Sequence, residues 1–391
     1  MARKKNVEVT ESNKERLSTA LVNIQEKLNS KYGLKVGLME DFDMDIKYLS
    51  TGSMVLNSLL GGGVAVGRII EFYGTASSGK TSMALSTIAE AQKNGLTCAF
   101  IDVEHAFAKN YARRIGVDTD KLIYSKPYVA EEVFSLAVDL ASSDEVDLIV
   151  IDSVSAMAAT AYSDDDKEIT KEQMGIIAQS MSKGLKKLTP ACEEHDCACI
   201  FINQVREKTG VMFGNPETTT GGRALEFYAS QRVRINRTKI IKGADDEAIG
   251  TEVKMEIKKN KTAAPFGVGE TVLSFDSGID KVGEIYVLGV KYKLIKKVGQ
   301  RFYVSIPVNE LTREEQTMLS NYPIEDNFIK IATYEQKTKD AIAEDENLFN
   351  VLSNRVVEIL MAKQNELAVK NKNDVVELEG EEDWLKSSFL N

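Results

Sequence analysis

Residues 74–81 constrain this chain more than any other stretch of its sequence. They fit the pattern G-x-x-x-x-G-K-[ST] and directly follow the apolar run 69–73. Small residues let successive backbone N–H groups surround phosphate oxygens, and a helix that begins near Gly79 adds the positive end of its dipole. Lys80 supplies a charge for the β- and γ-phosphates, and Thr81 supplies a hydroxyl for Mg²⁺. The predicted phosphate-binding residues are Gly74, Thr75, Ala76, Ser77, Ser78, Gly79, Lys80 and Thr81. The alternative is a glycine-rich turn that binds nothing.

The chain around this stretch alternates between strand-like and helix-like runs. The apolar runs with the character of buried strands are 68–73, 97–104, 121–124 and 146–152. The helical patterns between them cover 79–93, a stretch that ends at Gly116, and 130–141. Apolar strands that alternate with helices are typical of a parallel sheet covered on both faces, so the predicted fold class is α/β. Ligands of such folds bind at the carboxyl ends of the strands.

Three carboxylates stand at those strand ends: Asp102, Glu104 and Asp152. Asp152 closes an apolar run of the Walker B type, which suits a carboxylate that orients Mg²⁺ or its waters. Glu104 ends the neighbouring strand, where a carboxylate can polarise the water that attacks the γ-phosphate. Each carboxylate can instead cap a loop or a helix, and this alternative stays open for all three.

Composition bounds the class of protein. A chain of 391 residues is long enough for a core domain and smaller additional domains. It has no apolar run of the roughly 20 residues that span a bilayer, and its first residues lack the apolar segment of a signal peptide. We therefore expect a cytoplasmic protein with no membrane partner.

Three cysteines, Cys192, Cys197 and Cys199, surround His195. This spacing is compatible with a metal site. The run 197–202 has the pattern of a buried strand, however, which favours structural thiols over zinc ligands.

The formal net charge of −10 argues against a nucleic-acid partner, but the charges are unevenly distributed. Residues 206–261 hold twelve Lys and Arg against eight Asp and Glu, whereas residues 374–383 hold six acidic residues and no basic one. An acidic end on a chain with a basic central segment suggests competition with an anionic ligand for the basic surface. The alternative is a solvated end without such a role.

Residues 206–223 form the most unusual segment of the sequence. They follow a predicted strand, 197–205, whose end lies beside the nucleotide site. The segment is so rich in Gly, Pro and Thr that we expect neither a helix nor a strand there. A loop in this position can change its order with the nucleotide state.

Four runs of the sequence closely resemble bacterial-type RecA recombinases. They are 100–106, Asn203-Gln204, 210–222 and 259–266. The resemblance covers about residues 15–290 and fades beyond Tyr292. It implies an ATPase, with ATP and Mg²⁺ as cofactors, that forms a right-handed filament on single-stranded DNA and exchanges strands with a homologous duplex. It also implies roles in recombination, DNA repair and the SOS response, and leaves single-strand-binding proteins, loader proteins or a repressor substrate open as further partners.

The resemblance assigns roles to individual residues. Glu104 corresponds to the water-activating carboxylate, and Gln204 corresponds to the γ-phosphate sensor at the root of the second DNA loop. Lys259 and Lys261 correspond to a lysine pair that reaches the neighbour's phosphates across the subunit interface, as arginine fingers do in trans. Tyr111 corresponds to the aromatic residue that packs on the base. Hydrolysis is then expected to need a filament.

The DNA-binding positions that the family implies lie in two loops, near 156–174 and 206–222, and on the helix that follows the first loop. They are Met174, Ser182, Lys186, Arg206, Lys208, Thr209, Gly221, Gly222 and Arg223. Cations and exposed glycine N–H groups contact phosphates without base preference, which suits sequence-independent binding.

Three positions depart from the family pattern. Thr209 stands where an aliphatic wedge is usual, Gln179 replaces a common arginine, and Ala108 replaces an aspartate that contacts adenine. These departures bear on adenine selectivity and on the wedge. They are compatible with a divergent member of the family, encoded by a bacteriophage for example.

Together these patterns predict a RecA-type P-loop ATPase core with a mostly parallel central sheet, an N-terminal helical arm and a small C-terminal α/β domain. The expected parts are an oligomerisation arm (1–49), the core (50–285), a C-terminal domain with an amphipathic helix over 348–361 (286–373) and an acidic tail (374–391). Two other classes stay open. A RecA-fold helicase or DNA motor shares the P-loop but lacks the run 210–222, and Glu104 argues against a coating filament that does not hydrolyse ATP.

Overall fold

The computed structural model describes residues 46–157, 171–207, 217–243 and 245–360, together with Val22, Ile24 and Ala362. Within these ranges the side chains of 171–174, 206–207 and 217–218 are not described. The chain divides into two units, 1–46 and 47–391, and every element below belongs to the second. Of the expected helical arm over 1–49, only Val22 and Ile24, which are helical, and residues 46–49 are described, and the acidic tail over 374–391 lies outside the described residues.

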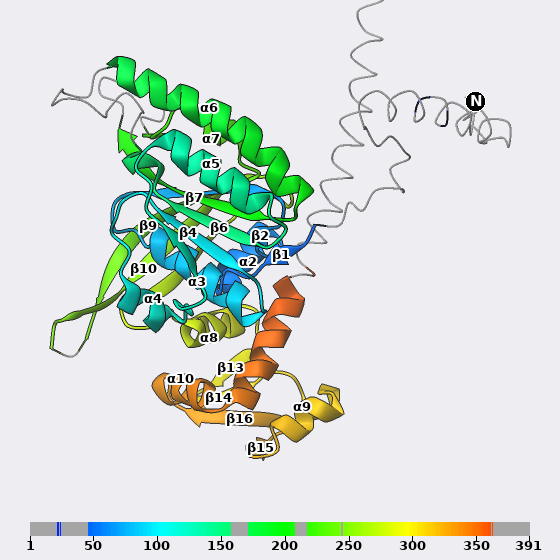
Figure 1. The fold of residues 1–391 in the computed structure, drawn as a ribbon. Coiled ribbons are helices and arrows are strands. Elements are labelled where there is room, and N and C mark those ends of the chain that lie inside the picture. The colour runs from blue at the N-terminus through cyan, green and yellow to red at the C-terminus, as the bar shows by residue number, and fades with distance from the viewer. Residues whose placement is uncertain are drawn as a thin grey trace, which may run out of the picture. The chain divides into compact units, whose positions relative to one another are not determined.

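A large sheet forms the centre of the second unit (Figure 1). In order across the described sheet the strands are β12 (Gly278–Ile279), β11 (Val268–Ser274), β10 (Ala248–Asn260), β9 (Gln231–Lys242), β3 (Ile69–Gly74), β7 (Ala198–Glu207), β6 (Leu148–Asp152), β4 (Cys98–Asp102) and β5 (Ile123–Ser125), with β8 (Glu217–Thr219) paired to β7. The strands from β9 to β5 run parallel to one another. Beyond β9 the pairing is antiparallel. The predicted α/β class with a mostly parallel sheet is confirmed.

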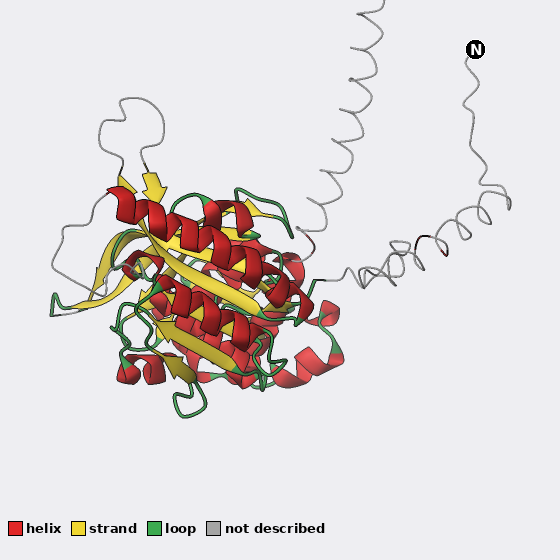
Figure 2. Cartoon of the chain, turned by 45° about the horizontal axis from the view of Figure 1, so that its top comes forward, coloured by secondary structure: helices red, strands yellow, loops and turns green. Residues whose placement is uncertain are grey.

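Helices cover both faces of this sheet (Figure 2). One face packs against α2 (Met54–Leu60), α3 (Lys80–Lys93) and α4 (Lys109–Ile115), and the other packs against α5 (Ala130–Ala141), α6 (Lys171–Glu194) and α7 (Ala224–Tyr228). Successive strand residues point to opposite faces, so Phe72 lies in the first apolar cluster and Ile69 lies in the second. The sheet is therefore apolar on both sides, as the near-continuous strand patterns predicted.

The prediction that residues 206–223 contain neither helix nor strand is wrong at both ends of the segment. β7 continues to Glu207, and β8 pairs with it in an antiparallel ladder whose register joins Val205 to Thr219. β-Branched threonines fit an extended pleated backbone, and the paired strands satisfy each other's N–H and C=O groups. Most of the Gly and Pro residues lie in 208–216, outside the described residues, or in the turn at 221–222.

A second group of elements follows the large sheet. Helix α8 (Lys281–Lys291) leads to a four-stranded antiparallel sheet of order β13 (Ile295–Val298), β14 (Arg301–Val304), β16 (Phe328–Thr333) and β15 (Ile324–Glu325). Helices α9 (Arg313–Met318), α10 (Glu335–Glu344) and one over 346–360 accompany it. Phe302, Ile331 and Leu352 belong to its own apolar cluster. The expected boundary between residues 285 and 286 falls within α8. A short ladder of β1 (Tyr48–Leu49) and β2 (Val64–Ala65) precedes β3.

Candidate nucleotide site and DNA-facing surface

The turn between β3 and α3 has a shape that only glycine allows at two positions. A Cβ atom on Gly74 would stand 1.9 Å from the carbonyl oxygen of Ile235. Gly79 has a φ of 92°, and a Cβ atom there would stand 2.3 Å from Cδ1 of Leu273. The backbone can therefore curl tightly against β9 and β11 before α3 begins, which leaves the first N–H groups of α3 directed into the turn.

Lys80 lies inside this turn. Its Nζ donates to the carbonyl oxygens of Thr75 at 2.6 Å and Gly74 at 3.3 Å, and its side chain is buried. Burial lowers the pKa of the ammonium group, and the carboxylates of Asp152 and Glu104 oppose that shift. The ammonium group of Lys80 therefore has mostly backbone carbonyls as partners, and phosphate oxygens can replace them.

Thr81 and Asp152 come together at the carboxyl end of the sheet. Thr81 Oγ1 donates to Asp152 Oδ2 at 2.7 Å. Burial raises the pKa of Asp152 to about 6, and the Thr81 hydrogen bond acts in the opposite direction. Two oxygen ligands beside a phosphate-binding turn fit the ligand preference of Mg²⁺, and a cation would relieve the cost of keeping this carboxylate ionised.

Glu104 lies two residues beyond the end of β4 and meets Gln204, which lies within β7. Gln204 Nε2 donates to Glu104 Oε1 at 3.1 Å, and the Ser153 hydroxyl donates to the same oxygen. The N–H groups of Val103 and Glu104 donate to the Asp152 carbonyl oxygen at 2.7 and 3.1 Å, which ties the end of β4 to that of β6. The site thus holds one exposed carboxylate in place with an amide and a hydroxyl. Ser153 was missed by the sequence argument, although it directly follows Asp152.

Asp102 has a different role from its two neighbours. It accepts hydrogen bonds from the N–H groups of Ala106 at 3.2 Å and Phe107 at 3.0 Å, and from the Tyr124 hydroxyl at 2.7 Å. The loop that carries Glu104 is therefore capped by Asp102. Of the alternatives open for this carboxylate, the structure supports the cap.

A cavity of about 240 Å³ extends from the phosphate-binding turn. Beyond residues 77–82 its walls are Tyr111, Thr251, Leu273 and Phe275. The Tyr111 hydroxyl lies 2.7 Å from Ser82 Oγ, so α3 itself orients the ring. Ala108 is the N-cap residue of α4 and makes no side-chain cap hydrogen bond. The planar and apolar walls fit a nucleotide base. Ala108 has only a methyl side chain, so it offers no polar group to distinguish one base from another.

Lys259 and Lys261 do not join this site. Lys259 pairs in register with Arg232 on β9, and Arg232 pairs with Glu71 on β3, three residues before the P-loop begins. Lys259 is therefore two strands away from β3 and toward the amino end of that strand. Its Nζ donates to the carbonyl oxygens of Glu226 at 2.8 Å and Phe227 at 2.9 Å.

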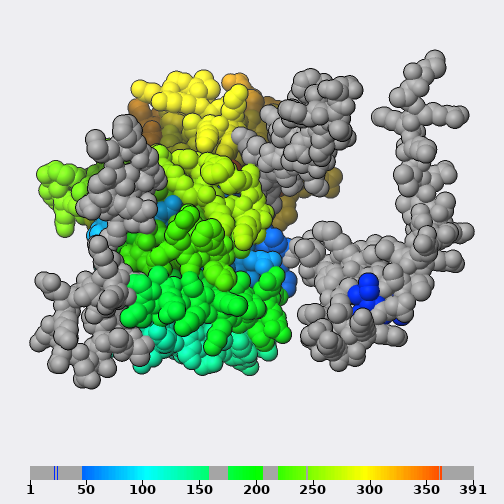
Figure 3. Space-filling view, turned by 90° about the horizontal axis from the view of Figure 1, so that it is seen from above, coloured from blue at the N-terminus to red at the C-terminus, as the bar shows by residue number. Residues whose placement is uncertain are grey.

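The predicted DNA-contacting residues gather in part around α6 and α7. Ser182 and Lys186 are exposed on α6. Gly221 and Gly222 have φ values of 85° and 79°, and Gly222 packs against Ala178 of α6. Arg223 follows as the N-cap of α7. Figure 3 views the molecule from this side, with these elements in green.

The other predicted DNA positions are described only in part or not at all. Met174 lies in α6 and Arg206 lies in β7, but their side chains are not described. Lys208 and Thr209 lie outside the described residues, as does most of the loop expected near 156–174.

The four cysteines are buried and free. Burial raises the pKa of Cys98 to about 12 and raises that of Cys199 well above its ordinary value. The His195 ring pairs with Asp144 at 2.6 Å instead of with the thiols. In the described ranges no three His, Cys, Asp or Glu side chains are grouped to hold a metal ion, and none of the described helices is long and apolar enough to cross a membrane.

The sheet order, the glycine-shaped turn and the carboxylates at the ends of β4 and β6 define a P-loop nucleotide hydrolase of the α/β class. The sequence pattern of the family described as RecA N-terminal domain matches residues 15–280. Protein RecA of Cytophaga hutchinsonii is 48% identical over 280 residues, which are 71% of this chain and 78% of that protein. The chain belongs to the RecA family.

Membership of this family establishes the general activity of the chain. The chain is a DNA-dependent ATPase of the recombinase type, which uses ATP, forms filaments on DNA and catalyses homologous pairing and strand exchange. Neither match favours the helicase alternative.

Proposed function

We propose that this chain hydrolyses ATP with Mg²⁺ at the interface between adjacent subunits of a filament on single-stranded DNA, and that Gln204 reports the γ-phosphate to the DNA-binding segment. The observation that carries the proposal is the contact between Gln204 and Glu104 at 3.1 Å. Gln204 stands on the strand that continues through Arg206 toward residues 208–216. An amide that exchanges this carboxylate for a phosphate oxygen moves the root of that segment.

Thr81 and Asp152 hold Mg²⁺ in this proposal. When bound, the ion neutralises charge on the β- and γ-phosphates. Thr81 contributes its hydroxyl oxygen, and Asp152 contributes a carboxylate whose raised pKa a bound cation would lower. Lys80 releases the carbonyls of Gly74 and Thr75 and donates to phosphate oxygens, while the N–H groups at the start of α3 bind the same anion.

Glu104 acts as the general base. Its Oε1 accepts from Ser153, and this bond keeps the carboxylate oriented when Gln204 turns to the γ-phosphate. The other oxygen of Glu104 can then accept a proton from the attacking water. The geometry of this group depends on Asp102, which caps the following loop. The Tyr111 ring forms a wall of the base pocket, and Ser82 holds its hydroxyl.

Lys259 and Lys261 complete the site of the next subunit. Within one chain they stand away from the P-loop, and a positive charge supplied in trans stabilises the transition state only after assembly. Residues 1–49 serve as the oligomerisation arm, and the part after residue 285 helps to capture the homologous duplex. Met174, Ser182, Lys186, Arg206, Lys208, Thr209, Gly221, Gly222 and Arg223 contact the DNA backbone or separate its bases. We place the protein in the cytoplasm, acting in the SOS response.

Mixing two inactive variants tests the shared site. The acceptor, Lys259→Ala with Lys261→Ala, has an intact P-loop but no trans charges, and the donor, Lys80→Ala, has both lysines but no working P-loop. Each alone should show little ATP hydrolysis on single-stranded DNA. A mixture should recover part of the turnover, with a maximum at intermediate ratios. If no ratio restores hydrolysis, the lysines act within their own subunit and the proposal is wrong.

A further inference from the structure

Glu71 is a fully buried carboxylate in the middle of β3. Its Oε2 accepts from Arg232 Nε at 2.5 Å, and its Oε1 accepts from Asn203 Nδ2 at 3.0 Å. The three side chains come from three adjacent strands, β9, β3 and β7, and lie on the face of the sheet that α7 covers. A buried ion pair of this kind contributes little more stability than apolar residues would, so its place in the fold is the more informative property.

On one side the contacts of this ion pair lead to the nucleotide site. The Asn203 side chain accepts from the N–H group of Gln204 at 2.9 Å. It also donates to the Thr220 carbonyl oxygen at 3.0 Å, immediately before Gly221 and Gly222. Through Asn203, Glu71 is thus connected to Gln204, the proposed γ-phosphate sensor. Through Asn203 it is also connected to the backbone just before the turn at Gly221 and Gly222.

On the other side the contacts lead to Lys259. Arg232 pairs with Glu226 of α7 at 3.1 Å and covers the Tyr73 ring at 4.8 Å from its centre. Lys259 in turn donates to the last carbonyl oxygens of α7, those of Glu226 and Phe227. Helix α7 is only five residues long, so its position depends on contacts with other elements. Leu225 packs in the core, Arg232 pairs with Glu226, and Lys259 caps the helix near its end.

We propose that Glu71 is a positioning residue for Lys259, acting through Arg232 and α7, and that Asn203 links this support to the strand end that carries Gln204. The inference rests on the proposed trans role of Lys259. In one subunit Gln204 reads the bound nucleotide, and the same polar cluster sets where that subunit's Lys259 stands for its neighbour. A glutamine at position 71 keeps the bond to Asn203 and removes the charge that holds Arg232. Its effect is therefore expected on the donor face of the subunit and not on the acceptor face.

The donor and acceptor variants test this separation. Adding Glu71→Gln to the Lys80→Ala donor should lower the turnover restored in mixed filaments by roughly tenfold to a hundredfold, because a small misplacement of a charged group is costly in catalysis. Adding Glu71→Gln to the acceptor should change restored turnover by no more than about twofold, since the glutamine oxygen still accepts from Asn203 and so leaves the link to Gln204 intact. The drop should appear in kcat, with the KM for ATP unchanged.

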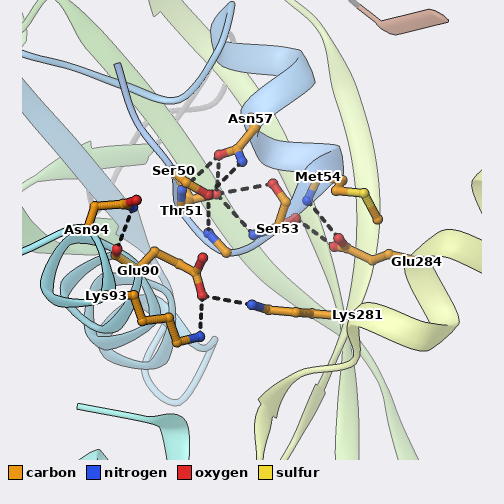
Figure 4. A network of polar contacts seen from close by, with 11 residues as sticks. Ser50, Thr51, Ser53, Met54, Asn57, Glu90, Lys93, Asn94, Lys281 and Glu284 are labelled. Carbon is orange, nitrogen blue, oxygen red and sulfur yellow. Dashed lines mark hydrogen bonds and ion pairs between the residues drawn. The ribbon is translucent and has the colours of Figure 1, made fainter. Parts of the chain in front are cut away.

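Glu284→Gln in the donor is the matched control. Glu284 is a comparably buried carboxylate that accepts from Ser53 Oγ at 2.6 Å and from the Met54 N–H group at 2.8 Å (Figure 4). It ties α8 to the start of α2 and makes no contact with α7 among the described residues. A donor with this change should restore as much turnover as the unmodified donor. Equal losses from Glu71→Gln and Glu284→Gln overturn the proposal, because they indicate general loosening of the fold.

The remaining outcomes are also decisive. Full restoration by the Glu71→Gln donor overturns the positioning role while leaving the trans lysines in place. Failure of the unmodified donor and acceptor to restore turnover overturns both proposals. If Glu71→Gln does not fold, Glu226→Gln removes the half-exposed partner that joins Arg232 to α7. It should give a smaller loss that is again confined to the donor, and equal losses in donor and acceptor would overturn the assignment.

A second readout follows Lys259 directly. Burial, Lys261 and Arg232 lower the pKa of its ammonium group, while Glu226 and Glu71 raise it. Removing the Glu71 charge should lower that pKa further. Amine modification of the full chain, quantified at Lys259 by mass spectrometry across pH, should therefore reach half of its maximum at a lower pH in Glu71→Gln. An unchanged midpoint would show that Glu71 does not act on Lys259.

Discussion

Replacing Asp152 with Asn should make the nucleotide-free protein more stable at neutral pH while it weakens Mg²⁺-dependent nucleotide binding. Asp152 is almost fully buried, and its pKa rises from an ordinary value of 3.8 to about 6. Burial is the main cause, and the carboxylates of Glu104 and Asp102 add to it. The folded protein without a cation therefore resists ionising this side chain. Asn keeps an oxygen that can accept from Thr81 and cannot ionise.

The size of the effect follows from the shift in pKa. Each unit corresponds to about 1.4 kcal/mol, so a shift of about two units amounts to roughly 3 kcal/mol. Because the folded-state pKa lies above the unfolded one, this contribution to stability is present below about pH 4 and is lost as pH rises through about 6. The variant lacks this loss. Its free energy of unfolding relative to the wild type should therefore rise by roughly 2–3 kcal/mol between pH 4 and pH 8.

Urea unfolding followed by circular dichroism, without nucleotide or Mg²⁺, measures this difference at each pH. Any effect of the amide on packing changes the free energy of unfolding by the same amount at every pH, so it does not affect the comparison between pH values. Asp139→Asn on the exposed side of α5 controls for the loss of one negative charge from the chain. A difference between Asp152→Asn and wild type that does not change with pH would refute the account of Asp152.

Three further predictions concern nucleotide and DNA. Glu104→Gln keeps the shape of the side chain but cannot take a proton, so turnover should fall roughly 10²–10⁴-fold while filaments persist in electron micrographs; wild-type turnover would remove Glu104 from the mechanism. Lys80→Ala should weaken nucleotide-stimulated binding to single-stranded DNA by roughly two orders of magnitude, and a retained response to ATP in an anisotropy assay would contradict this. Deleting residues 374–391 should speed duplex binding and lower its Mg²⁺ requirement, because six tethered carboxylates no longer compete with phosphate. Unchanged rates would instead favour docking of a partner by the apolar residues of that segment, which are Trp384, Leu385, Phe389 and Leu390.

The parts of the site that sequence reasoning placed well depend on local rules. Gly74, Gly79, Lys80 and Thr81 act through a turn whose geometry is set by adjacent residues, and Asp152 lies at the end of an apolar run that can only be a buried strand. The carboxyl ends of parallel strands then bring Glu104 and Gln204 to the same edge. Spacing in the chain and one topological rule were sufficient to place all of these residues except Gln204, which was selected by the resemblance to the family.

The parts that were missed depend on contacts between distant residues. Arg232 lies 161 positions from Glu71, and a lone acidic residue in an apolar strand gives no indication of its partner. The ladder between β7 and β8 was missed because the Gly, Pro and Thr content of 206–223 argued against a strand. The two strands pair although residues 208–216 separate them in sequence. Asp102 and Glu104 look alike in sequence, and only the loop geometry shows that one caps backbone N–H groups while the other faces Gln204.

If Lys259 acts in trans as proposed, its contacts give a physical reason why hydrolysis begins only after assembly. In a single chain its ammonium group satisfies two carbonyl oxygens at the end of α7, and burial already makes this charge costly. Moving it to a neighbour's phosphate exchanges two neutral acceptors for an anion, which is favourable only when that anion is present. When Lys259 leaves, α7 loses its cap and keeps the buried Leu225 and the Arg232–Glu226 ion pair, with Arg232 itself held by Glu71. In the proposed filament, where Lys259 is engaged across the interface, the buried ion pair is therefore most needed after assembly.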